Sequence, residues 1–248
     1  MQQLLSIAIW IGAALLTLLL WAGSAVFVAL FGWWCDRDRR MTHWWARAWA
    51  WAMVRMNPMW SLAVEGGGRL EPRRAYVLVA NHQSFADVVV LPYIRVPYKC
   101  FSKEELYRVP FFGWSLALHK HIRIRRGSVK SIQESMEEAR RWLQRGMPVA
   151  FFAEGTRSRT GTLGEFKSGA FKLAIETGVP VVPLVIQGTR DALPKGDWVL
   201  RHRVAGTLTI LPPIETREMA PDDADRLKER VYTLMRRLLD PPQDHPTE

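Results

Sequence analysis

Residues 76–240 alternate between two patterns of apolar and polar positions. Short apolar runs predict strands, whereas apolar residues at every third or fourth position predict helices. We expect strands at 76–80, 99–102, 122–126, 148–152, 181–186 and 204–211. We expect helices at 88–93, 131–145, 166–177 and 222–239, with a helical turn at 103–108. Strands that alternate with helices predict an α/β domain with a mostly parallel sheet flanked by helices.

Residues 4–34 contain no charged side chain. These 31 positions exceed the roughly 20 residues that span a bilayer. The run is also too long for the apolar core of a signal peptide. Because three glycines interrupt it, a bent or re-entrant helix is an alternative to a simple transmembrane helix. Arg37, Arg39 and Arg40 follow, and such charges predict a cytoplasmic position, here at a bacterial-type inner membrane.

Residues 42–57 predict an amphipathic helix that lies in the membrane interface. Nine of the twelve tryptophans lie within the first 60 residues, and tryptophan prefers the level of the lipid headgroups. A core helix of a soluble domain is the alternative. We therefore divide the chain into a membrane-anchoring segment (1–60), an α/β domain (61–240) and a flexible tail (241–248), with a glycine-rich joint at 66–68.

Composition and missing motifs exclude several classes of protein. The net charge is +10, and two distant cysteines argue against a disulfide framework and favour a reducing compartment. His119 and His121 have a spacing seen in metal sites but lack an acidic or cysteine partner, so we expect no metal. The signatures of P-loop, dinucleotide-binding and esterase-elbow proteins are missing from the sequence. Basic charge with aromatic residues also suits nucleic acid, but aromatics beside a membrane segment are better explained by lipid.

His82 and Asp87 form the first candidate site, directly after the expected strand at 76–80. The carboxyl ends of strands are where open α/β sheets build their sites. A neutral imidazole can accept a proton from a hydroxyl, and a carboxylate on its other nitrogen fixes the tautomer. The alternative is a helix-capping sequence from Ser84 to Asp87, beside a partly buried histidine.

Two further groups of residues follow expected strands. Glu154, Gly155 and Arg157 come after the strand at 148–152, where the guanidinium can bind a phosphate and the glycine permits close approach. A surface turn with a Glu–Arg pair is the alternative. Arg126 at the end of the strand at 122–126 and Lys103 after the strand at 99–102 are candidate anion ligands. The alternatives are a basic patch near anionic lipid and a surface lysine.

Taken together, the motifs resemble those of the 1-acylglycerol-3-phosphate O-acyltransferase family, also called lysophosphatidate acyltransferases. They are Asn81-His82-x-x-x-x-Asp87, Glu154-Gly155-Thr156-Arg157-Ser158 and Val179-Pro180-Val181-Val182-Pro183. The segment 103–126 resembles the stretch between the family's first and third motifs, and the resemblance covers about residues 75–190. Arg125 stands where the family usually has Asp, which makes the acceptor site more basic, and Ala153 stands where it often has Pro.

The resemblance implies transfer of an acyl group from an acyl thioester to the free hydroxyl of 1-acyl-glycerol-3-phosphate. His82 would be the general base, and Asp87 would orient it. The other implied substrate-binding residues are Lys103, Arg126 and Arg157 for the phosphate, Glu154 for Arg157 or the glycerol, Gly155 and Thr156 in the same loop, and Pro180 and Pro183 in the acyl pocket.

The resemblance also implies the partners. They are membrane lipids, lysophosphatidate and either acyl-CoA or acyl carrier protein as co-substrate, with no cofactor, metal or nucleic acid. The product would be phosphatidic acid for phospholipid biosynthesis. Two alternatives remain: a member of the family that acylates another lysophospholipid or a lyso-aminolipid, and a non-enzymatic lipid-binding membrane protein.

Overall fold

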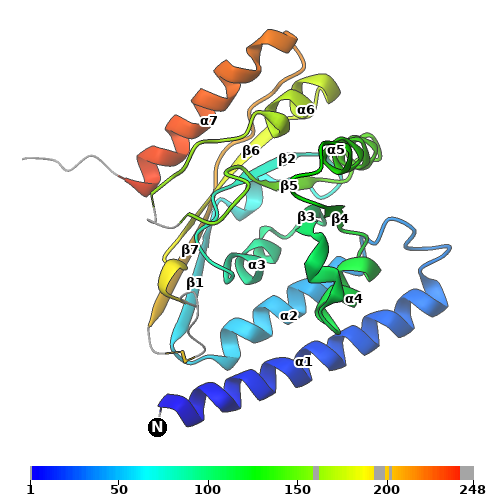
Figure 1. The fold of residues 1–248 in the computed structure, drawn as a ribbon, viewed down its shortest axis with the longest axis vertical. Helices are drawn as coiled ribbons and strands as arrows, with labels where there is room; N and C mark the ends of the chain where they lie inside the picture. The colour runs from blue at the N-terminus through cyan, green and yellow to red at the C-terminus, as the bar shows by residue number, and fades with distance from the viewer. Residues whose placement is uncertain (1, 159–161, 193–198, 201–202, 241–248) are drawn as a thin grey trace, which may run out of the picture.

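A mixed sheet forms the centre of the molecule. The computed structural model describes residues 2–158, 162–192, 199–200 and 203–240. In this part of the chain, seven strands pair in the order β1-β7-β6-β2-β5-β3-β4 (Figure 1). They are β1 (Trp60–Glu65), β2 (Val77–Ala80), β3 (Lys99–Lys103), β4 (Ile122–Ile124), β5 (Val149–Phe152), β6 (Val181–Gln187) and β7 (Val204–Ile210). Among these seven described strands, only β6 and β7 pair antiparallel, so the expectation of a mostly parallel sheet is confirmed.

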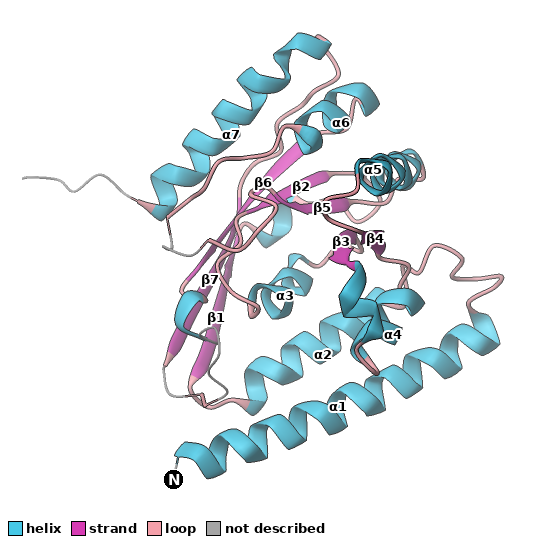
Figure 2. Ribbon diagram, viewed as in Figure 1, coloured by secondary structure: helices cyan, strands magenta, loops and turns pink. Residues whose placement is uncertain are grey.

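Helices cover both faces of the sheet (Figure 2). They are α1 (Gln2–Phe31), α2 (His43–Met56), α3 (Asp87–Val90), α4 (Phe112–Leu118), α5 (Val129–Gln144), α6 (Gly169–Thr177) and α7 (Ala224–Leu239). Successive side chains of a strand point to opposite faces. Val77 and Val79 of β2 therefore join the core under α5, α6 and α7, whereas Leu78 and Ala80 join the core on the side of α3. Burial on both faces explains why β2 is apolar at every position.

The carboxyl ends of the central strands meet at one edge. Ala80 at the end of β2 pairs with Phe152 of β5 and Leu184 of β6. Next to β5, Lys103 ends β3 in register with Ile124 of β4. The loops that follow these strands therefore leave the sheet on the same side, as the sequence pattern predicted.

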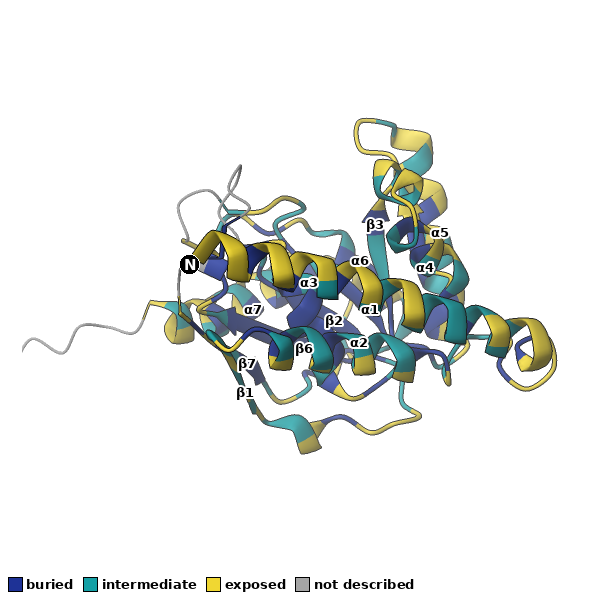
Figure 3. Ribbon diagram, turned by 90° about the horizontal axis from the view of Figure 1, so that it is seen from below, coloured by how far each residue is buried: buried dark blue, intermediate teal, exposed yellow. Residues whose placement is uncertain are grey.

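Helix α1 is long enough and apolar enough to cross a membrane, by length and composition. It lies alongside α2 and α4, as the view from below shows (Figure 3). Trp49 Nε1 donates to Thr17 Oγ1 at 2.9 Å, and the rings of Trp21 and Trp114 lie 5.3 Å apart. The other side of α1 carries exposed apolar side chains, including Leu4, Ile7, Ile11, Leu15, Leu18, Leu19, Val26 and Leu30. We call these eight residues the apolar face of α1.

Helix α2 forms where the sequence predicted it, and it packs between α1 and the sheet domain. Ala50 and Val54 are buried against Val89 of α3. The outer side exposes Trp44 and Trp51, each with an arginine guanidinium over its ring. The buried side of α2 fits the alternative of a core helix. The exposed side, with its tryptophans and arginines, fits the prediction of a helix in the membrane interface.

Lys99 fastens the linker between α1 and α2 to the sheet. This β3 side chain is only 1% exposed, and its Nζ donates to the backbone oxygens of Asp38 at 2.8 Å and His119 at 2.6 Å. The ring of Trp142 lies 4.7 Å from the same nitrogen. Desolvation by burial lowers the pKa of Lys99 to about 7, against the opposing effect of the Asp36 and Asp38 carboxylates.

Several boundaries differ from the predicted ones. Strand β1 was not predicted, because its residues stand between an apolar helix and a glycine-rich turn and its partner β7 is distant in the sequence. The strand at 122–126 ends at Ile124, since the nitrogen of Arg125 bonds to Ser131 Oγ instead of a neighbouring strand. The helix predicted from Phe166 begins at Gly169, because the nitrogen of Lys167 bonds to the oxygen of Ala153. The predicted tail at 241–248 lies outside the described residues.

Candidate active site

The His82 and Asp87 side chains meet in the loop that joins β2 to α3. The ring Nδ1 lies 2.7 Å from Asp87 Oδ2, and the aspartate side chain is fully buried. The same oxygen accepts hydrogen bonds from the backbone nitrogens of Gln83 at 2.7 Å and Ser84 at 2.9 Å. The carboxylate therefore binds the histidine ring and also makes the contact to the Ser84 backbone that the capping interpretation predicts.

The His82 ring is held in one orientation. It stacks on the Phe152 ring with 4.0 Å between centroids and 19° between planes, and 15% of its side chain is exposed. When Nδ1–H donates to the carboxylate, Nε2 carries a free lone pair. A hydroxyl that approaches this nitrogen therefore meets a proton acceptor that Asp87 has already oriented.

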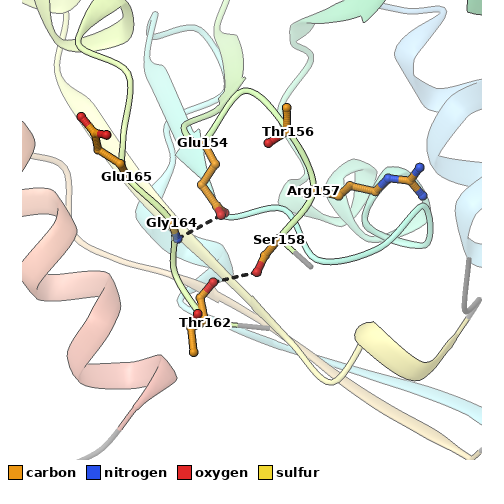
Figure 4. A pocket seen from close by; sticks show the side chains of 7 residues that line it. All are labelled: Glu154, Thr156, Arg157, Ser158, Thr162, Gly164 and Glu165. Carbon is orange, nitrogen blue, oxygen red and sulfur yellow. Dashed lines mark hydrogen bonds between the residues drawn. The ribbon is translucent and has the colours of Figure 1, made fainter. Parts of the chain in front are cut away.

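Glu154 joins the loop after β5 to the His82 loop. Its Oε1 accepts from the backbone nitrogen of His82 at 3.1 Å, and its Oε2 accepts from that of Gly164 at 3.0 Å (Figure 4). The Arg157 side chain points away from this carboxylate in the same view. Glu154 thus holds two backbone segments in place, whereas the family resemblance implied a role in placing Arg157 or the glycerol.

A hollow of about 430 Å³ lies beside these loops. Its lining residues are Glu154, Thr156, Arg157, Ser158, Thr162, Gly164 and Glu165. Gly155 stands between two of the lining residues, Glu154 and Thr156, and has a φ of 69°, a conformation that favours glycine. Within the described residues, Arg157 is exposed and has no hydrogen bond or ion pair, so its guanidinium is available to an anion.

Lys103 and Arg126 lie at the same edge of the sheet but do not line the hollow. Lys103 Nζ forms an exposed ion pair with Glu105 at 3.2 Å. Arg126 is exposed in the turn after β4, not in the strand as predicted. The neighbouring Arg125 forms an ion pair with Glu104 at 2.6 Å. The structure therefore brings Arg157 to the hollow and leaves the other two cations further along the edge.

Pro180 and Pro183 lie away from His82. The oxygen of Pro180 accepts from the nitrogen of Val77, which places this proline at the amino end of β2, opposite the site. Pro183 is buried within β6 in register with Val79. The implied acyl-pocket role of the two prolines has no counterpart in this placement. Among the described residues, no three or more His, Cys, Asp or Glu side chains gather to hold a metal ion.

Comparison with known proteins adds to this geometry. A family model described as Acyltransferase matches residues 61–187, just over half of the chain. The chain belongs to the acyltransferase family. The resemblance read from the motifs is thereby confirmed, and the matched range begins at the second residue of β1 and ends with β6.

Individual relatives of this acyltransferase carry a more specific name. A chloroplastic 1-acyl-sn-glycerol-3-phosphate acyltransferase of Brassica napus is 36% identical over 71% of the chain. The alpha form of the same enzyme from Homo sapiens is 34% identical over 71% of the chain. The chain spans 50% of the length of the Brassica protein and 64% of the human one.

The fold also matches a solved structure of the family. The crystal structure of the 1-acyl-sn-glycerophosphate acyltransferase PlsC from Thermotoga maritima aligns with a TM-score of 0.71 and 25% identity. The alignment covers 97% of this chain and all of that one, so it includes α1 and α2 as well as the sheet domain.

Two contacts of the site were not predicted from the sequence. Asn81 exchanges hydrogen bonds of 2.8 Å with the backbone nitrogen and oxygen of Ile186. Thr189 Oγ1 donates to Asp87 Oδ1 at 2.6 Å. More than 100 residues separate the partners, and no local pattern marks either of them. Residues after β6 reach the His82 loop because β2 and β6 pair in parallel, so that their carboxyl ends lie side by side.

Proposed function

We propose that this acyltransferase moves an acyl group from an acyl thioester to the free hydroxyl of 1-acyl-glycerol-3-phosphate, giving phosphatidic acid. The observation that carries the proposal is the 2.7 Å contact of His82 with buried Asp87. It lies at the same strand-end edge as the hollow that holds Arg157. The names of the relatives support lysophosphatidate as the acceptor.

In the proposed reaction, His82 acts first as a base. Its Nε2 takes the proton of the acceptor hydroxyl while the oxygen attacks the thioester carbonyl carbon. Asp87 stabilises the imidazolium that forms, because its carboxylate faces the protonated Nδ1. The carbon–sulfur bond then breaks, and the thiolate leaves with the proton that His82 returns. The products are the ester and a free thiol, so no proton is gained or lost overall.

The acceptor phosphate would bind near Arg157. A phosphate monoester carries close to two negative charges near neutral pH, and an arginine fork binds two of its oxygens. Lys103 and Arg126 lie along the same edge and would add attraction, although each is exposed. Gly155 and Thr156 would contribute backbone and hydroxyl donors from the same turn.

The apolar face of α1 would lie in the membrane. Eight exposed apolar side chains on one helix are unusual for a surface in water, and lipid removes them from contact with it. Arg37 and Arg40 follow the helix and would meet anionic headgroups on the cytoplasmic face of a bacterial-type inner membrane. This position would give the site direct access to a lipid acceptor.

An acceptor and donor panel tests the proposal. Purified protein is mixed with lysophosphatidate, other lysophospholipids or a lyso-aminolipid, each with acyl-CoA or acyl carrier protein, and the products are read by mass spectrometry. We expect phosphatidic acid from lysophosphatidate and no product from the His82→Ala variant. Turnover of another lysolipid in preference would identify a different acceptor, and near wild-type activity of His82→Ala would exclude this mechanism.

A further inference from the structure

Thr189 lies in the turn after β6 and contacts the His82 loop through Asp87. It is 1% exposed, and its Oγ1 is 2.6 Å from Asp87 Oδ1. The preceding Gly188 has a φ of 75°, and a Cβ at that position would collide with the oxygen of Ala205. A glycine is therefore required for the turn that brings the threonine hydroxyl to the carboxylate. Thr189 also lies two residues beyond the range matched by the family model.

The two oxygens of Asp87 have different partners. Oδ2 faces His82 Nδ1 and the backbone nitrogens of Gln83 and Ser84. In the part of the chain that the structure describes, Oδ1 has Thr189 as its only hydrogen-bond donor. Because the side chain is fully buried, bulk water cannot replace a lost donor.

The end of β6 supports both ends of the His82 loop. Asn81, just before the histidine, exchanges two hydrogen bonds with the backbone of Ile186. Asp87, five residues after His82, is held by Thr189. The loop is therefore fixed on one neighbouring strand end at two points, and the second point is the carboxylate that orients the base.

We propose that Thr189 is a positioning residue for acyl transfer. By bonding Oδ1, its hydroxyl fixes the plane of the Asp87 carboxylate, so that Oδ2 stays directed at His82 Nδ1. The proposal rests on the proposed function, in which His82 is the base. It adds a third member, from a distant segment, to the His82–Asp87 pair.

Steady-state kinetics with lysophosphatidate test the positioning role. Thr189→Val keeps the volume and removes the hydroxyl, and the loss of one hydrogen bond to a charged group predicts a fall in kcat of roughly ten- to a hundredfold. KM should change little, because Thr189 is buried and does not line the hollow. Thr189→Ser should restore kcat. Thr209→Val is the matched control, since Thr209 is also buried and donates to a carboxylate, that of Glu65, at 3.1 Å.

The NMR signal of the His82 Nδ1–H proton tests the same link without turnover, because this proton donates to Asp87. We expect its downfield signal to weaken or move upfield in Thr189→Val and to return in Thr189→Ser. Thr189→Ala removes the same hydroxyl with less bulk, in case the valine does not fold. An inactive wild-type protein would refute the proposed function and leave this comparison of signals intact. An active wild type with unchanged kcat and an unchanged Nδ1–H signal in folded Thr189→Val or Thr189→Ala would overturn the role of Thr189.

Discussion

The Oε1 atom of Glu154 lies 3.1 Å from the backbone nitrogen of His82, so the end of β5 holds the end of β2. Its other oxygen bonds to the nitrogen of Gly164, which borders the same hollow as Arg157. One carboxylate thereby sets both the position of the base and the shape of the wall beside it.

Replacing Glu154 by alanine should therefore impair turnover without removing a reacting group. Two hydrogen bonds to a charged group are lost, each worth about 1.5–3 kcal/mol, so we expect at least a tenfold fall in kcat and a lower Tm. Glu229→Ala is the control, because Glu229 is exposed on α7 and does not line the hollow. Equal activity of the two variants in the acyl-transfer assay would contradict the structural role of Glu154.

Arg157→Lys should weaken the capture of lysophosphatidate. Lysine keeps the charge but cannot make the paired contacts of a guanidinium, so the KM for the acceptor should rise roughly tenfold. The KM for the acyl thioester should stay the same. Arg141→Lys, an exposed arginine of α5, is the control. A rise in the KM of the donor instead would mean that Arg157 binds the phosphates of coenzyme A or of the carrier protein.

Charge on the apolar face of α1 should release the protein from membranes. Leu15 and Leu19 are 61% and 69% exposed, and burying each in lipid contributes about 1.5–3 kcal/mol. We expect Leu15→Lys combined with Leu19→Lys to lower the fraction that floats with liposomes. Leu238→Lys, at an exposed leucine of α7, should float like the wild type. Full flotation of the double variant would show that another surface binds the membrane.

Lys99 should make stability rise with pH above neutrality. Its pKa is lowered from 10.5 to about 7 in the folded chain, because burial disfavours the charged form. Between these values the unfolded chain binds more protons than the folded one, so the free energy of unfolding increases with pH. At lower pH the folded state carries the full cost of a buried charge, which the two backbone acceptors of Lys99 only partly offset.

The Lys99→Met variant measures this contribution. Unfolding between pH 7 and 9 should show a smaller rise in stability than in the wild type, by up to about 1.4 kcal/mol per pH unit. Lys130→Met is the control, since that side chain is 87% exposed on α5. Parallel curves for wild type and Lys99→Met would show that the lysine titrates as it does in water.

The sequence predicted the elements whose evidence is local. Consecutive apolar residues mark β2 and β6, and apolar residues at helical spacing mark α5 and α7. The predicted type and approximate bounds of these four elements were therefore correct. Strand β1 was missed because this edge strand only half-buries every second residue and depends on β7 for its pairing.

The site likewise contains residues that a local pattern predicts and residues that depend on distant segments. His82, Asp87, Glu154 and Arg157 stand directly after strands, so the parallel sheet was enough to place them at one edge. Thr189 depends on hydrogen-bond geometry between segments 102 residues apart, which no pattern in the sequence encodes. Pro180 lies at the opposite end of the strands from His82 because of the register of β2 with β6. Apolar periodicity cannot determine this register.

The supports of the His82 loop also set an order of events during synthesis of the chain. Helix α1 is complete at residue 31, whereas the loop gains its contacts to Glu154, Ile186 and Thr189 only after those residues have been translated. Strand β1 likewise waits for β7, about 140 residues later, before it can pair. A nascent chain can therefore meet a bilayer through α1 long before its histidine is held in place, so that membrane contact comes ahead of catalytic competence.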